Sequence, residues 1–289
     1  QDASVDGRLL VTRDDQPQSL YVRPPGAIGL QDYSWLDGSF GPILSDDGEL
    51  LAFSDQSVFG GSQYAVTIRK TDGSPAVRIG EGMPVAISRD KRWVLGTLPT
   101  APPEYRLYPV GAGEPRSLAW VGLESVASVA FFPDSRSLFV CGNERDRAPR
   151  CYRSPLDASA LEPVTPDSVG NGLLRPDGRA VAVSRSDGWW VYPLDGGLPV
   201  RVPGLDDAIV LRWSPDGTAL WVQSEAGPDA HLDRVDLASG RRTPLLTVET
   251  PSDASIFAIL NVAVADDPGV YVFSARSYRS ALFTIEGVR

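Results

Sequence analysis

The chain has 289 residues, of which 42% are hydrophobic, and it carries a formal net charge of −10 at pH 7. This charge argues against a surface that binds nucleic-acid phosphates, and no apolar run approaches the roughly 18 residues of a membrane span. The 28 glycines and 25 prolines are spread along the chain and indicate many turns. A single all-β domain with a sizeable core is therefore expected.

In chain order, short β-prone runs alternate with a recurring turn. It is clearest in LRWSPDGTALWVQS, where Pro215 and Gly217 suit a type I turn between two runs with a two-residue period. The related copies are SVDG at Ser4, SDDG at Ser45, SRDK at Ser88, FPDS at Phe132, RPDG at Arg175, SPDG at Ser214 and ADDP at Ala265. Their third-position residues, expected to be structural turn residues, are Asp6, Asp47, Asp90, Asp134, Asp177, Asp216 and Asp267.

These copies follow one another at intervals of 39 to 51 residues, and a second turn containing small residues follows each of them. Each unit therefore predicts four strands: in the second unit these are 40–44, 49–53, 65–69 and 76–79, and in the fifth 173–174, 180–184, 189–192 and 200–202. One such meander cannot bury both of its faces, whereas a ring of them can. The sequence predicts a β-propeller of four-stranded antiparallel blades.

Seven blades are expected, with six as the alternative, in one domain that spans residues 1–289. The approximate blades are 1–38, 39–81, 82–123, 124–166, 167–206, 207–253 and 254–289. The seventh unit leaves no room for a fourth strand, so its blade is expected to be incomplete unless an upstream segment closes it. Because the chain starts at Gln1 without Met, we expect a leader or an upstream region to have been removed.

Residues for catalysis or for a metal are scarce. His231 is the one histidine, in a strand-like run, and is expected to be structural or on the surface. The aspartate pairs lack the D-x-D-x-D-G alternation of a calcium loop, and no G-x-S-x-G is present. We therefore expect no catalytic residue, no metal and no cofactor. The alternative is an enzyme acting at the central channel, where Asp2, Arg212 and Asn261 are the polar candidates, or the propeller half of a peptidase-type hydrolase.

Two cysteines, Cys141 and Cys151, flank the loop GNERDRAPR between two expected strands. Opposite positions of an antiparallel pair lie close enough for a disulfide, although two buried thiols remain the alternative. A disulfide would indicate an oxidising compartment.

The loops between second and third strands are the expected place for function, because they are long, irregular and gathered on one face. Exposed aromatic and arginine side chains are enriched at interfaces. The candidate partner-binding residues are Phe59, Arg145, Arg147, Arg150, Arg276, Tyr278 and Arg279. Ordinary solvated loops are the alternative. Most tryptophans are expected in the core, with Trp35 among the exceptions.

IRKTDGSPAVRIGEG from Ile68, YPLDGGLPVRVPGLDD from Tyr192, LRWSPDGTALWVQ from Leu211 and RVDLASGRRTPL from Arg234 resemble the TolB-like, PD40-type propeller repeats of bacteria. ALFTIEGVR from Ala281 resembles the same repeats. Among them, the resemblance is strongest to the C-terminal propeller of bacterial receptor-like serine/threonine protein kinases. The resemblance implies a non-catalytic sensing or docking module outside the cytoplasm. Kinase motifs are absent from this sequence, so kinase activity is not implied.

The expected function is therefore an extracytoplasmic, periplasmic binding, sensor or scaffold module. It would engage a protein or peptide partner through one propeller face, as part of a receptor or as an accessory subunit of a membrane-associated complex. No nucleic acid is expected as a partner, and no insertion of this segment into a membrane. A tether to the membrane would come from an upstream segment or from the partner.

Overall fold

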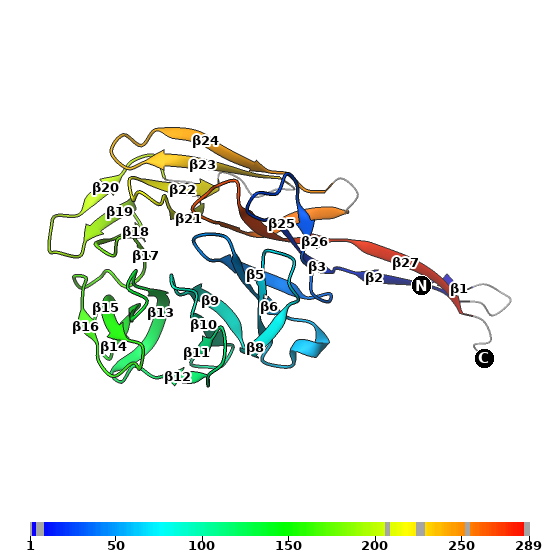
Figure 1. The fold of residues 1–289 in the computed structure, drawn as a ribbon, viewed down its shortest axis with the longest axis horizontal. Helices are drawn as coiled ribbons and strands as arrows, with labels where there is room; N and C mark the ends of the chain where they lie inside the picture. Colours follow the sequence, from blue (N-terminus) through cyan, green and yellow to red (C-terminus); the bar gives the residue numbers. More distant parts are fainter. Residues whose placement is uncertain (1, 4–8, 206–208, 224–228, 252–254, 286–289) are drawn as a thin grey trace.

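The computed structural model describes all residues except 1, 4–8, 206–208, 224–228, 252–254 and 286–289. The described chain forms six four-stranded antiparallel sheets and one three-stranded sheet. Figure 1 shows the six sheets arranged as the blades of a ring, with the three-stranded sheet projecting from it. The predicted all-β propeller of four-stranded blades is confirmed. The ring has six blades, which was the alternative, and not the seven that the turn copies favoured.

Five blades are continuous in sequence, each running from its inner to its outer strand. The first consists of β5 (Ser39–Leu44), β6 (Leu50–Asp55), β7 (Ala65–Lys70) and β8 (Val77–Glu81). The second consists of β9 (Met83–Ile87), β10 (Trp93–Leu98), β11 (Glu104–Pro109) and β12 (Arg116–Leu118). The third consists of β13 (Leu123–Phe131), β14 (Ser137–Glu144), β15 (Arg150–Pro155) and β16 (Glu162–Pro163).

The fourth blade consists of β17 (Leu173–Leu174), β18 (Ala180–Arg185), β19 (Gly188–Pro193) and β20 (Val200–Val202). The fifth consists of β21 (Ile209–Trp213), β22 (Ala219–Gln223), β23 (Ala230–Asp236) and β24 (Arg242–Val248). Helix is confined, in the described part of the chain, to the single 3-10 turn η1 (Val58–Gly60). No helix among the described residues is long and apolar enough to cross a membrane.

The sixth blade joins the two ends of the chain and explains why there are six blades. It consists of β25 (Ile256–Val264) and β26 (Tyr271–Ser277), followed by β3 (Gln18–Arg23) and β4 (Gln31–Asp32). β26 pairs with β3 from Tyr271 opposite Arg23 to Arg276 opposite Gln18. The units expected as a first and a seventh blade thus share one sheet, because each would otherwise leave the backbone groups of a strand edge unpaired.

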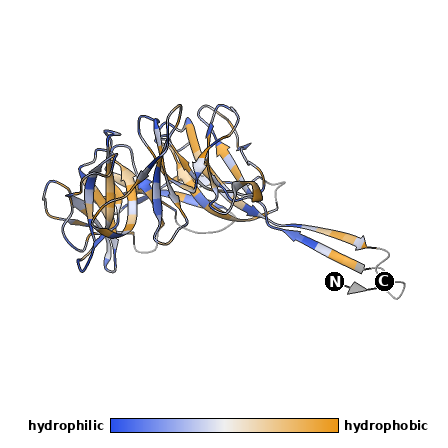
Figure 2. Ribbon diagram, turned by 90° about the horizontal axis from the view of Figure 1, so that it is seen from below, coloured by the Kyte–Doolittle hydropathy of each residue, from blue (hydrophilic) through white to orange (hydrophobic). Residues whose placement is uncertain are grey.

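The strands left over from this closure form a ribbon. It consists of β1 (Asp2–Ala3), β2 (Leu9–Asp15) and β27 (Arg279–Ile285), with β2 in the middle. Figures 1 and 2 show the ribbon extending away from the disc, with β1 at its far end. Asp2, expected near the channel, is therefore on the ribbon instead.

The recurring aspartates shape the turns between the first and second strands. Asp216 accepts hydrogen bonds from the Ser214 hydroxyl at 2.5 Å and from the Thr218 amide at 3.0 Å, and Gly217 has φ +66°. The Oδ1 atoms of Asp47, Asp90, Asp134, Asp177, Asp216 and Asp267 each accept the backbone amide two residues later. Asp6 lies outside the described residues.

Each interface between neighbouring blades contains one buried apolar cluster. Between the second and third blades, for example, Leu95 and Leu107 pack with Val129, Leu138 and Val140. The buried residues of the described chain form six such clusters, one for each interface of the ring. Alternating strand positions supply both sides of every blade, so the core is distributed around the ring.

Because strand direction alternates within each blade, the connections fall on two faces. We call the face with the turns between first and second strands the turn face. The opposite face, with the connections between second and third strands, is the loop face. In the sixth blade, the ribbon stands where the second strand, β26, connects to the third strand, β3. It therefore belongs to the loop face.

Candidate functional site

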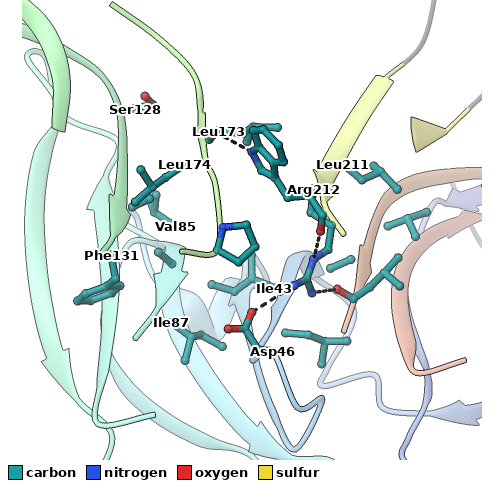
Figure 3. Close-up of a pocket in the computed structure, with 18 of the residues that line it drawn as sticks. Ile43, Asp46, Val85, Ile87, Ser128, Phe131, Leu173, Leu174, Leu211 and Arg212 are labelled. Carbon is teal, nitrogen blue, oxygen red and sulfur yellow. Dashed lines mark hydrogen bonds and ion pairs between the residues drawn. The ribbon is translucent and has the colours of Figure 1, made fainter. Parts of the chain in front are cut away.

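A channel runs between the inner strands of all six blades. Its volume is about 680 Å³, and residues of β5, β9, β13, β17, β21 and β25 line it. The lining is mainly apolar, as the close-up in Figure 3 shows for Ile43, Val85, Ile87, Phe131, Leu173, Leu174 and Leu211. Polar lining residues include Ser128 and Asn261, whose Oδ1 accepts a hydrogen bond from the Ser274 hydroxyl at 3.2 Å.

A network of ion pairs spans the channel at the turn face. Arg212 of the fifth blade donates to Asp266 of the sixth at 2.5 Å and to Asp46 of the first at 3.3 Å; Figure 3 shows the contact with Asp46. Arg89 of the second blade lies 3.4 Å from Asp46 and donates to the Pro176 carbonyl of the fourth at 3.2 Å. Two arginines and two aspartates thus connect five blades through a network without net charge.

The carboxylates of this network are held by cations. Burial raises the pKa of Asp266 above its ordinary value; Arg212 opposes this rise and the neighbouring Asp46 adds to it. Arg212 also donates to the Val264 carbonyl at 2.6 Å. Of the three polar channel candidates, Arg212 and Asn261 do line the channel. In the sequence, Asp46 and Asp266 belong to aspartate pairs that lack the spacing of a calcium loop, and no pattern indicates a role for Arg89.

In the part of the chain that the structure describes, His231 does not lie in a cluster of metal-binding side chains. His231 is exposed on β23, the third strand of its blade, with Nδ1 3.2 Å from the Thr247 hydroxyl oxygen. Among the described residues there is no group of three or more His, Cys, Asp or Glu side chains placed to hold a metal ion.

A second candidate site lies on the loop face at the base of the ribbon, where the first and sixth blades meet. Large apolar side chains are exposed there: Phe59 is 77% and Val58 95% exposed. The connection from β4 to β5 adds Trp35 and Leu36, β25 adds Phe257, and the start of the ribbon adds Tyr278. We define the base patch as Trp35, Leu36, Val58, Phe59, Phe257 and Tyr278, all of which are exposed.

Backbone hydrogen bonds hold the segments of the base patch together. The Gln56 amide donates to the Gly38 carbonyl at 2.7 Å, and the Gln18 amide donates to the Asp37 carbonyl at 3.2 Å. On the other side, the Tyr278 amide donates to the Ser255 carbonyl at 3.1 Å. Gly38 is required for this approach, because a Cβ on it would lie 2.4 Å from the Ser57 nitrogen.

The predicted partner-binding residues fall into two separate groups. Phe59 and Tyr278 belong to the base patch, and Arg276 and Arg279 lie beside it at the end of β26 and the start of β27. The Tyr278 hydroxyl donates to Asp14, and this hydrogen bond raises the pKa of the tyrosine.

The other group lies across the ring in the third blade, where each arginine is paired with an acid of its own blade. Arg145 Nε lies 2.7 Å from Glu124, and Arg147 lies 3.2 Å from Glu144. Arg150 lies 3.3 Å from Asp167 and donates to the Thr165 carbonyl at 2.9 Å. The structure therefore does not bring these arginines together with the base patch.

The two cysteines are joined by a disulfide. Cys141 and Cys151 are opposite each other in the β14–β15 register and are fully buried, within the cluster between the third and fourth blades. The bond connects neighbouring strands of one blade.

Solved structures share this fold. TolB from Acinetobacter baumannii is 13% identical, with a TM-score of 0.57; the match covers 92% of this chain and 66% of that protein. Putative TolB from Agrobacterium tumefaciens is 16% identical, with a TM-score of 0.62 and coverage of 92% and 99%. An oligogalacturonate lyase in complex with manganese is 16% identical, with a TM-score of 0.53 and coverage of 90% and 82%.

No protein-family model and no curated protein sequence matches the chain. At 13 to 16% identity, the structural likeness establishes the fold, a TolB-like β-propeller. This fold occurs both in TolB and in an oligogalacturonate lyase, so the fold alone does not specify a function.

Proposed function

We propose that this chain is a non-catalytic binding module that engages a protein or peptide partner through its loop face. The observation that carries the proposal is the base patch, six exposed apolar residues on neighbouring segments of the first and sixth blades and the ribbon. Contiguous exposed apolar surface mostly marks an interaction site. Burying Trp35, Phe59, Phe257 and Tyr278 would provide the aromatic contacts that dominate binding energies.

The distribution of apolar residues supports the loop face over the turn face. In the connections on the turn face, Ile28 and Leu198 are exposed, but they lie in the sixth and fourth blades, which are not neighbours. The channel supports catalysis less well, because its paired carboxylates Asp46 and Asp266 are both bound to Arg212.

The proposal includes a location outside the cytoplasm. The buried Cys141–Cys151 disulfide supports this, since disulfides persist mainly in oxidising compartments. The sequence likeness to PD40-type repeats of receptor-like kinases supports the same location and a role as sensor, scaffold or accessory subunit of a membrane-associated complex. The TolB-like fold agrees with this assignment.

Site-specific photocrosslinking tests the proposal. A photoreactive phenylalanine derivative replaces Phe59 in one variant, and Ile28 or Leu198 on the turn face in two matched controls. In cells of the native host we expect a discrete crosslinked protein from position 59 and none from the controls. The substitutions Trp35→Ser and Phe257→Ser, introduced together, should remove this crosslink. Equal crosslinking from all three positions, or from the turn face alone, would contradict the proposal.

A further inference from the structure

The ribbon has an open edge. β27 pairs with β2 along its whole length, and among the described residues no strand pairs with its other side. All seven residues of β27 are exposed. β24, the outer strand of the fifth blade, is equally long, but four of its seven residues are partly or fully buried. Alternate residues of an edge strand direct their N–H and C=O groups away from the sheet, where another strand can pair with them.

The outer half of one face of the ribbon is apolar, and the half nearer the disc carries Arg13, Asp15 and Arg279. Val11 lies opposite Phe283 and Arg13 opposite Ala281, so these side chains share a face with Ile285. The other face is mixed and carries Leu10, Thr12, Asp14, Ser280, Leu282 and Thr284. Phe283 is 48% and Ile285 45% exposed, and Figure 2 shows the outer half of the ribbon as hydrophobic. A ribbon of so few strands is marginal in water, so a cover over this face would stabilise it.

We propose that the open edge of β27 binds an extended segment of a partner polypeptide as an additional strand. This inference rests on the proposed function. The segment would carry apolar residues at alternate positions, which extend the face of Phe283 and Ile285, and its other residues would include lysine or arginine. β27 begins beside Tyr278, so a segment paired along β27 runs directly onto the base patch.

Charge favours a basic partner over a second copy of the chain. Each copy has a net charge of −10, so two copies repel each other, and an anionic lipid surface is repelled in the same way. A cationic segment is attracted to the same body. The occupant is therefore a basic, extended polypeptide, and self-association or lipid binding would each contradict the inference.

A selection of phage-displayed random peptides against the full chain tests this. We expect the enriched peptides to alternate apolar and polar residues and to contain lysine or arginine. In amide hydrogen exchange, a bound peptide should slow exchange at alternate residues of β27. Binding should fall at least about tenfold in the double variant Phe283→Thr and Ile285→Thr, which retains β-forming residues, and should not change in Leu198→Thr.

Four outcomes would overturn the inference. The selection yields no binding peptide; peptides bind without protecting β27; sedimentation shows dimers that protect β27; or vesicles of anionic phospholipid protect it. Peptides that depend on Phe59 but leave β27 amides unchanged would uphold the proposed function while rejecting strand addition. If the photoreactive residue at position 59 gives no crosslinked protein in the otherwise unchanged chain, the proposed function itself is rejected.

Discussion

Arg212 on β21 and Asp266 after β25 form an ion pair 2.5 Å long that connects the fifth and sixth blades at the end of the channel. The same guanidinium reaches Asp46 in the first blade, so it bridges both sides of the blade that closes the ring. Both carboxylates contact this cation, and its removal leaves the two negative charges with only Arg89, which lies 3.4 Å from Asp46.

Replacing this arginine should therefore weaken the fold more than replacing an exposed one. We expect Arg212→Met to lower the free energy of unfolding by about 2 kcal/mol, because partly buried carboxylates lose their charged partner. Arg145→Met is the matched control: its arginine is 82% exposed and paired with Glu124, so its effect should stay below about 0.5 kcal/mol. Urea denaturation measures both values, and equal losses would refute a special role for Arg212.

The turn aspartates should make stability depend on pH. The hydroxyl of Ser214 and the amide of Thr218 donate to Asp216 and lower its pKa below the ordinary 3.8. Its ionised form is thus favoured in the folded state, so its contribution to stability is present above pH 3.8 and is lost as pH falls through the folded pKa.

Asp216→Asn should accordingly be less stable than the parent above this range, and the difference should shrink as the pH falls. Thermal unfolding at a series of pH values measures it. Ser214→Ala removes the donor of the strongest of these hydrogen bonds and should reduce the pH dependence in the parent background. A difference that stays constant with pH would show that the carboxylate does not titrate as described.

The disulfide should stabilise the third blade. Reducing the Cys141–Cys151 bond, or replacing both residues with alanine, is expected to lower the free energy of unfolding by about 2 to 3 kcal/mol. The intact mass should increase by two hydrogen atoms on reduction. The alanine double variant should show no response to reductant in denaturant unfolding. If reduction leaves the free energy of unfolding of the parent unchanged, the bond does not stabilise the blade, and packing alone holds the two cysteines together.

Gly80 should not tolerate a larger residue. A Cβ on Gly80 of β8 would lie 2.0 Å from Cε1 of the Tyr108 ring, which is buried in the interface between the first and second blades. We expect Gly80→Ala to destabilise the protein by about 2 kcal/mol through overpacking. Gly111→Ala, where no atom lies within 4 Å, should have little effect. Differential scanning calorimetry of the pair would reveal whether the ring simply moves aside.

Local features of the chain were sufficient to predict the blades. The turn from Ser214 to Gly217 contains its own hydrogen-bond acceptor in Asp216, and the flanking runs show a two-residue period. For this reason the expected strands 65–69 and 189–192 fall within β7 and β19. The opposite positions of Cys141 and Cys151 follow from the same local hairpin.

By itself, then, the sequence determined that the chain forms four-stranded antiparallel blades, because each turn and hairpin depends on residues close in sequence. The tertiary structure decided that there are six, because the open edges of β26 and β3 pair across the whole length of the chain. It also decided which residues meet: Arg212 with Asp46 in the channel, and Phe59 beside the segment that contains Trp35. Contacts of this kind depend on how the ring closes, and no local pattern encodes that.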